Sequence, residues 1–220
     1  YPLFMRIILC RAGVSWVLRL GNCMNDPNRD IVERMMGIGP GRLLPVAGEG
    51  QTTLFFEERN SIRAAMSAAL VDAPEEKAWE RLLDFESYSG RIPGIRSSKI
   101  VSRRGNEVRV RYVTGVRVMK MWVDEKYTHR MVIERPYMHT YNDHDGAVNG
   151  FWAVFSAEGA GGGAGEGCLL VRAGIARDMK AFGFILKMIG EQGETADAGL
   201  RLSPVIMLVS HMKRWIEKAV

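Results

Sequence analysis

Apolar residues near the C-terminus repeat with the period of an α-helix. Ser203 is a good N-cap residue, and Pro204 suits the first helical position. The sequence therefore predicts a long amphipathic helix over 203–220. The helix buries one broad stripe, formed by Val205, Leu208, Val209, Met212, Trp215, Ile216 and Ala219.

The chain from residue 51 to 176 shows mainly the alternation typical of β-strands. Residues 52–71 are rich in β-branched, aromatic and small side chains, which predicts one long strand with a bulge near Asn60. Shorter strands are predicted at 98–103, 108–114, 116–123, 128–134, 138–142, 150–157 and 168–176. Because no helix pattern separates these short strands, they are expected to pair antiparallel.

Two further segments have helical spacing. Residues 74–85 predict a short helix, since Pro74 suits a first turn and Trp79 belongs to an apolar face. The apolar segment Lys180 to Ile189 reads either as a short core helix or as a lid over a pocket. Together these patterns predict an α+β fold, in which a curved antiparallel sheet of about six or seven strands wraps around the C-terminal helix.

The glycine-rich run from Glu158 to Gly167 contains the pattern GxGxxA of nucleotide-binding loops. That pattern binds phosphate only where a helix begins directly after it, so that helix N–H groups face the anion. A strand pattern follows here instead. The run is therefore interpreted as a hairpin loop.

Residues 1–50 are interpreted as an N-terminal extension of unknown role, and residues 51–220 as the main domain. Gly37 to Gly41 reads as a loop. Residues 5–23 outline a signal peptide, but Arg11 and Arg19 interrupt the apolar stretch and no AxA-like cleavage site follows. We therefore expect a cytoplasmic protein, with export through this segment as the alternative.

Composition is that of an ordinary globular protein. The chain has 220 residues, of which 47% are hydrophobic, and its 30 basic and 25 acidic residues give a net charge of +5. The basic residues are scattered among acidic ones, so nucleic acid is not an expected partner. Four arginines come closest to forming a basic cluster, and we interpret them as the solvent face of a hairpin: Arg103, Arg104, Arg109 and Arg111.

No metal site, cofactor or catalytic constellation is predicted. The three cysteines are an odd number without a CxxC pair. His144 lies between Asp143 and Asp145, in a segment of strong turn formers, and is interpreted as part of a solvated turn. If the protein moves protons, the candidate residues are Tyr127, His139 and Tyr141.

Aromatic and methionine residues on the predicted strands and helices suggest the wall of a ligand site, although an ordinary filled core has the same composition. Adjacent strand residues point to opposite faces, so only one of Phe151 and Trp152 lines the interior. Phe155 points to the same face as Phe151. The predicted ligand-binding residues are Tyr112, Trp122, Trp152, Phe182, Ile185, Val205, Leu208 and Met212.

The segment VDAPEEKAWERLLDFESYSGRIPGIRSSKIV, which begins at Val71, carries a family resemblance. With its strand ending in Asp-Ala-Pro, its Trp-bearing helix and its Pro93-Gly94-Ile95 turn, the chain from about residue 61 to 220 resembles the START-like or SRPBCC superfamily of polyketide cyclases and coenzyme Q-binding proteins. The resemblance implies the helix-grip fold and an internal cavity for a lipid, quinone, sterol or polyketide. Its members include carriers, ribosome-associated toxins and cyclases, so it does not fix the function.

The expected function is non-catalytic binding or carriage of a hydrophobic small molecule. The first alternative is a polyketide cyclase or aromatase using the same cavity. The second is an interaction protein of the ribosome or a membrane enzyme, contacted through the basic end of the C-terminal helix at Lys213, Arg214 and Lys218. A peripheral membrane contact and the oligomeric state are left open.

Overall fold

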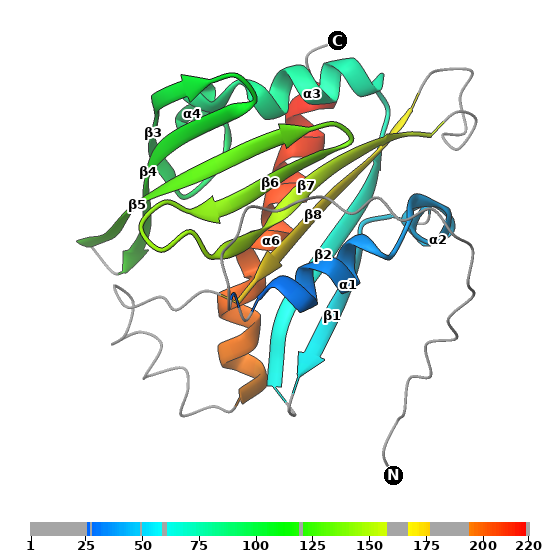
Figure 1. Ribbon diagram of the computed structural model, residues 1–220, viewed down its shortest axis with the longest axis horizontal. Helices are drawn as coiled ribbons and strands as arrows, with labels where there is room; N and C mark the ends of the chain where they lie inside the picture. The colour runs from blue at the N-terminus through cyan, green and yellow to red at the C-terminus, as the bar shows by residue number, and fades with distance from the viewer. Residues whose placement is uncertain are drawn as a thin grey trace.

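Eight antiparallel strands form one curved sheet in the part of the chain that the structure, a computed structural model, describes (Figure 1). That part comprises residues 26, 28–48, 50–58, 61–118, 121–157, 167–176 and 194–218. The spatial order is β1-β2-β8-β7-β6-β5-β4-β3. The strands are β1 (Thr52–Glu58), β2 (Ser61–Val71), β3 (Ile95–Arg104), β4 (Glu107–Val118), β5 (Met121–Glu134), β6 (Tyr137–Asn142), β7 (Val148–Ser156) and β8 (Cys168–Ile175).

The predicted antiparallel sheet is confirmed, but two strand assignments were wrong. The single bulged strand predicted over 52–71 is instead the antiparallel pair of β1 and β2, with Thr52 paired to Ala68. The strands predicted at 116–123 and 128–134 are not separated by a turn, because β5 continues through the polar residues 124–127. Asp124 pairs with Gly115 and Lys126 with Val113 across to β4, so the polar residues alternate along a strand instead of forming a loop.

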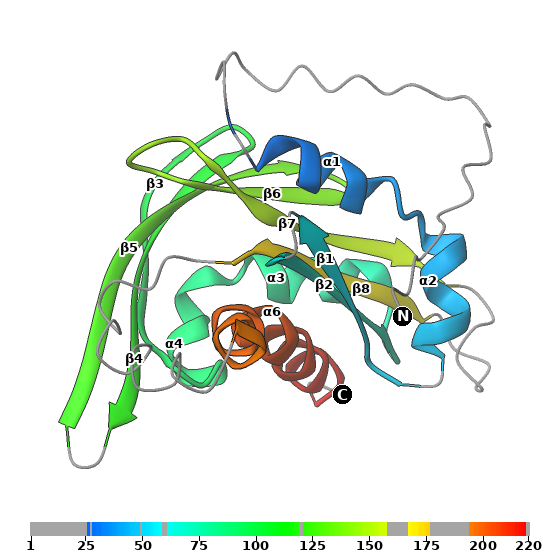
Figure 2. The ribbon, with the colours of Figure 1, turned by 90° about the horizontal axis from the view of Figure 1, so that it is seen from below.

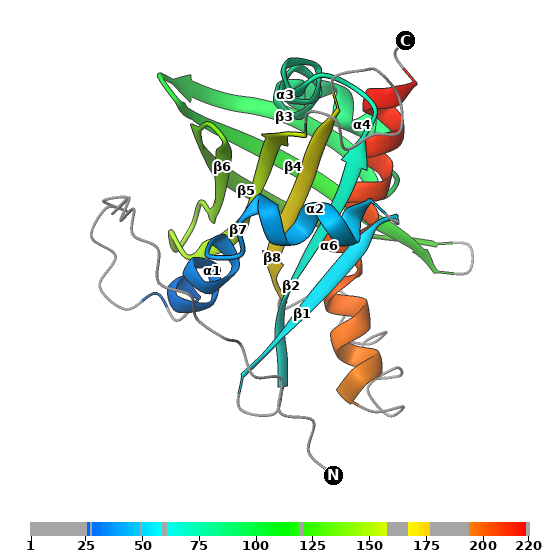
Figure 3. The ribbon, with the colours of Figure 1, turned by 90° about the vertical axis from the view of Figure 1, so that its right-hand side faces the viewer.

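The helices lie on the two faces of the sheet (Figures 2 and 3). On the outer face lie α1 (Arg29–Met36) and α2 (Pro40–Ala47). The concave face holds α6 (Glu194–Glu217), with α3 (Glu75–Leu83), a 3-10 turn (Phe85–Ser87) and α4 (Tyr88–Arg91) beside it. The loop predicted at 37–41 therefore ends earlier, because Pro40 begins α2. The division of the chain near residue 50 stays a prediction.

The long C-terminal helix is confirmed, but it begins at Glu194, and Pro204 lies inside it rather than at its start. An interior proline removes one backbone hydrogen bond and costs about 3 kcal/mol. Burial of neighbouring side chains offsets that cost, since Leu202 and Val205 pack against Ala65 of β2. Tertiary packing thus overrides the local stop signal.

Each face of the sheet has its own apolar core. On the concave side, Trp79 of α3 and Trp152 of β7 pack with Met212 of α6. On the outer side, Met35 and Phe151 belong to the core under α1 and α2, and Phe155 packs against the same core. The predicted opposition of Phe151 and Trp152 is confirmed.

Two glycines allow close contacts at the centre of the fold. Gly150 of β7 is paired with Gly174 of β8. A Cβ atom on Gly174 would lie 2.7 Å from Cγ2 of Val205, so a larger residue would push α6 away from the sheet. The short distance between α6 and β8 therefore depends on glycine at this position.

Candidate functional site

The strands present a set of polar and aromatic side chains on the concave face, the face that α6 covers. These residues alternate along their strands with outward-facing ones, and most lie beside apolar residues that belong to the concave core. Together with Tyr88 of α4, this set is called the interior polar cluster, and its strand members are Tyr112, Tyr127, His129, Thr140, Asn149, Trp152 and Arg172.

A β-bulge directs Asn149 into the cluster. Thr140 pairs with Gly150 but Tyr141 pairs with Val148, which leaves Asn149 as the extra residue of β7. The bulge requires glycine next to it, since Gly150 has φ +139° and a Cβ there would lie 2.1 Å from the carbonyl oxygen of Ala173. As a result, Nδ2 of Asn149 lies 2.9 Å from Nε2 of His129, and both side chains are buried.

Three tyrosines continue the cluster toward α4. The Tyr127 ring lies 4.7 Å from the His129 ring and 5.5 Å from the Tyr112 ring, centroid to centroid. Tyr88 lies 6.4 Å from Tyr112, and its hydroxyl donates to the carbonyl oxygen of Leu82 at 2.7 Å. Burial raises the pKa of Tyr88 and of Tyr112, so both hydroxyls are neutral at physiological pH.

Arg172 places a positive charge within this face. Only 8% of its surface is exposed, its Cζ lies 5.4 Å from the centroid of the Trp152 ring, and its Nη1 donates to Oγ1 of Thr140 at 3.4 Å. Its charge partly opposes the rise in the pKa of Tyr88 and Tyr112 that burial causes. The cluster therefore combines neutral hydroxyls, an imidazole, an amide and a guanidinium inside an apolar wall.

Hydrogen bonds to the β1–β2 side of the sheet hold α6 over the concave face. Nε2 of Gln51 lies 2.7 Å from Oγ of Ser67 and 2.8 Å from the carbonyl oxygen of Ile206. Further along the helix, Lys213 donates to the carbonyl oxygen of Leu70, and Glu217 accepts from the backbone N–H of Asp72. The C-terminal half of α6 is thereby tied to β2, and Lys213 is directed at the sheet rather than at solvent.

The structure places some of the predicted ligand-binding residues on the concave side. Tyr112, Trp152 and Met212 are buried there, and Leu208 packs against the same core while half-buried. Val205 instead fills the contact between α6 and β2. Phe182, Ile185 and the side chain of Trp122 lie outside the described residues.

The three predicted proton-transfer candidates are not brought together. Tyr127 lies in the interior polar cluster, whereas His139 and Tyr141 face the opposite side of the sheet. There the His139 ring lies 6.5 Å from the Phe151 ring. His144 is confirmed as part of an exposed turn, where its side chain is 82% exposed beside Asp145.

Sequence reasoning missed His129, Asn149 and Arg172. A signal existed for His129, which is two residues from Tyr127 on one strand and therefore shares its face. Arg172 likewise lies two residues after Leu170 on β8, so both side chains point to the same face of the sheet. No signal existed for Asn149, because the bulge reverses the direction that simple alternation gives it.

The described residues contain no group of three His, Cys, Asp or Glu side chains that could hold a metal ion. Within the same described part, no helix combines the length and apolar character that crossing a bilayer requires.

Comparison with solved structures finds similar folds at low identity. A STAR-related lipid transfer protein from Xanthomonas axonopodis is 11% identical over 76% of this chain and 94% of its own, with a TM-score of 0.53. The Zhui aromatase/cyclase from Streptomyces sp. R1128 is 15% identical over the same shares, with a TM-score of 0.43. TTHA0849 from Thermus thermophilus is 16% identical over 70% of this chain and 97% of its own, with a TM-score of 0.46.

The first of these structures supports the START-like fold. No curated protein matches the chain significantly. A family model described as "Polyketide cyclase / dehydrase and lipid transport" matches residues 71–192, which is more than half of the chain. By this match and by its fold, the protein belongs to the polyketide cyclase / dehydrase and lipid transport family of START-like, or SRPBCC, proteins.

Proposed function

We propose that the protein binds or carries a hydrophobic small molecule, such as a lipid, a quinone or a polyketide-like compound, between α6 and the concave face of the sheet, without transforming it. The observation that carries this proposal is the interior polar cluster. Ligand sites are mostly apolar surfaces with a few well-placed polar groups, and the concave core has that composition.

The chemistry of the cluster indicates how such a ligand is oriented. Trp152 and Met212 offer an apolar surface to the body of the ligand. The hydroxyls of Tyr112 and Tyr127, together with Arg172, provide donors for oxygen atoms at one end of it. The preferred ligand is therefore an elongated hydrophobic molecule with an oxygen-bearing end.

Two comparisons support the proposal. The description of the family includes lipid transport, and the Xanthomonas axonopodis protein of similar fold is named as a lipid transfer protein. Binding alone is preferred to catalysis because, of the three proton-transfer residues predicted from the sequence, only Tyr127 faces the concave side.

The experiment is native mass spectrometry of the purified protein, followed by organic extraction and identification of any released compound. We expect a stoichiometric hydrophobic ligand. Titration with a fluorescent fatty acid then compares Tyr127→Phe, on the concave face, with Tyr137→Phe, a partly buried tyrosine on the outer face. Loss of one hydrogen bond costs about 1 kcal/mol, so Tyr127→Phe should bind several-fold more weakly and Tyr137→Phe normally.

Absence of any bound or acquired ligand, or equal effects of the two substitutions, would contradict the proposal. The matched pair separates ligand contact from general loss of stability, because both substitutions remove one hydroxyl from a tyrosine of the same sheet.

A second candidate function is a cyclase or aromatase, and the contact between Asn149 and His129 beside Tyr127 favours it. In an aldol cyclisation, the imidazole would remove a proton next to a carbonyl group. The deprotonated carbon would form the new carbon–carbon bond by attacking the carbon of a second carbonyl group. A tyrosine hydroxyl would donate its proton to the oxygen of that second carbonyl group. Turnover of a polyketide surrogate by the wild type, with loss of turnover but not of binding in His129→Gln, would establish this function in place of simple carriage.

A further inference from the structure

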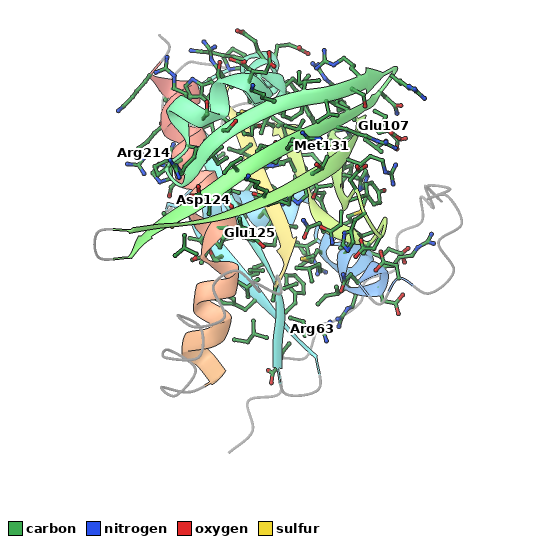
Figure 4. The ribbon with its side chains drawn as sticks, turned by 90° about the vertical axis from the view of Figure 1, so that its left-hand side faces the viewer. Arg63, Glu107, Asp124, Glu125, Met131 and Arg214 are labelled. Atoms are coloured by element: carbon green, nitrogen blue, oxygen red, sulfur yellow. The ribbon has the colours of Figure 1, made fainter. Side chains whose placement is uncertain are left out.

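The outer face of β3, β4 and β5 carries an excess of basic side chains. Residues on this face alternate with Val108, Val110 and Tyr112, which point into the concave core. Among the described elements, no helix covers it, and Figure 4 views the molecule from this side, with Glu107 and Asp124 near opposite ends of the strands. We call this surface the basic outer face, and it comprises Arg96, Lys99, Arg104, Glu107, Arg109, Arg111, Asp124, Lys126, Arg130 and the adjoining Asp143.

Each acidic residue of the basic outer face is already bound to an arginine. Asp124 pairs with Arg96. Glu107 lies 3.5 Å from Nε of Arg109 and 3.3 Å from Nη1 of Arg130, and Asp143 lies 3.2 Å from Nε of Arg109. The acids therefore neutralise only part of the positive charge.

Four basic side chains of this face remain uncompensated. They are exposed, and none of them has a carboxylate within ion-pair distance among the described residues: Lys99, Arg104, Arg111 and Lys126. They project into solvent, where an approaching anion meets no competing acidic group.

The strand register places like charges directly opposite each other on this face. Lys99 pairs with Arg111 across β3 and β4, and Arg109 pairs with Arg130 across β4 and β5. Like charges in such positions destabilise a sheet. Glu107 relieves the second pair, but no described acid relieves the first. A sequence that breaks a local rule of stability in this way commonly does so at a functional surface.

We infer that the basic outer face docks the protein on the surface of an anionic lipid bilayer. The face lies on the convex side of the curved sheet, where no described helix covers it, so its shape suits contact with a flat surface (Figure 2). Val101, which is 49% exposed beside this face, adds an aliphatic contact. Proteins that bind single-stranded nucleic acid use exposed aromatic platforms, and the described side chains of this face include none. This inference goes beyond ligand binding and does not depend on an occupied interior.

The test is co-sedimentation of the full chain with vesicles of phosphatidylcholine containing one quarter phosphatidylserine, compared with vesicles of pure phosphatidylcholine. We expect binding to the anionic vesicles alone, and weaker binding at high salt, because salt screens the attraction. A basic residue close to an anionic membrane strengthens binding roughly fivefold, so the double variant Lys99→Glu, Arg111→Glu should bind at least about 25-fold more weakly.

The matched control is Arg42→Glu with Arg63→Glu, which changes the net charge equally at exposed positions on α2 and β2. This variant should retain most of the binding, and circular dichroism should show both variants folded. Equal losses in the two variants, no binding of the wild type to anionic vesicles, or binding to duplex DNA without binding to vesicles would each overturn the inference.

Discussion

Nδ2 of Asn149 lies 2.9 Å from Nε2 of His129, a contact that reaches from β7 to β5 across the intervening strand. It exists because an extra residue in β7 turns Asn149 toward the concave face. The interior polar cluster therefore depends on a backbone irregularity as much as on the identity of its side chains.

Replacing Gly150 should remove this irregularity. In Gly150→Ala, the new Cβ would lie 2.1 Å from the carbonyl oxygen of Ala173, at a φ of +139° that alanine rarely adopts. We expect a loss of at least about 2 kcal/mol in the free energy of unfolding, measured by urea denaturation. Gly41→Ala is the control, since nothing lies within 4 Å of its Cβ position in α2, and it should stabilise the protein by about 0.5–1 kcal/mol.

The contact between Gly174 and Val205 should appear as coupling between two substitutions. Gly174→Ala alone forces Cβ to 2.7 Å from Cγ2 of Val205, while Val205→Ala alone leaves a small gap. In the double variant, the smaller helix residue makes room for the new methyl group. Urea denaturation of all four proteins should show a double variant at least about 1 kcal/mol more stable than the sum of the single effects, and strict additivity would refute direct contact.

Acid should destabilise the outer core through His139. Burial lowers the pKa of this imidazole, an effect that the charge of Glu134 partly opposes. The folded state therefore binds its proton at lower pH than the unfolded state does. Stability contributed by the neutral ring is complete above the unfolded pKa, near 6.5, and is lost as the pH falls from there through the lowered folded value.

Urea denaturation at a series of pH values checks this assignment. His139→Phe should reduce the loss of stability below pH 6.5 compared with the wild type. If the free energy of unfolding of His139→Phe fell with decreasing pH as steeply as that of the wild type, other groups would be the cause of the acid sensitivity.

Cys168 should be unreactive in the folded protein. Burial raises the pKa of its thiol to about 12, with a further contribution from the charge of Glu75. Since the thiolate is the reacting form, iodoacetamide at pH 8 should leave Cys168 unmodified and should label it fully in urea. Peptide mass spectrometry distinguishes this residue from the other cysteines, and rapid labelling without urea would refute its burial.

Much of the architecture was predictable because it depends on local periodicity. Alternation along the chain identified most strands and gave the opposite directions of Phe151 and Trp152, and helical spacing identified α3 and the C-terminal part of α6. The β1–β2 hairpin was missed because the sequence between Glu58 and Ser61 contains neither Gly nor Pro, the residues that most often signal a turn. The start of α6 was missed because Ser203 and Pro204 are typical of a helix start, a local preference that packing against β2 overrides.

The sequence by itself determined the fold class, the antiparallel character of the sheet and the alternation that directs Tyr112, Tyr127 and Trp152 toward one side. Those properties follow from neighbours along the chain. Only the tertiary structure decided that His129, Asn149 and Arg172 meet on the concave face, and that His139 and Tyr141 lie on the other. Such contacts join residues far apart in sequence, and the bulge beside Gly150 changes a side-chain direction that no local pattern records.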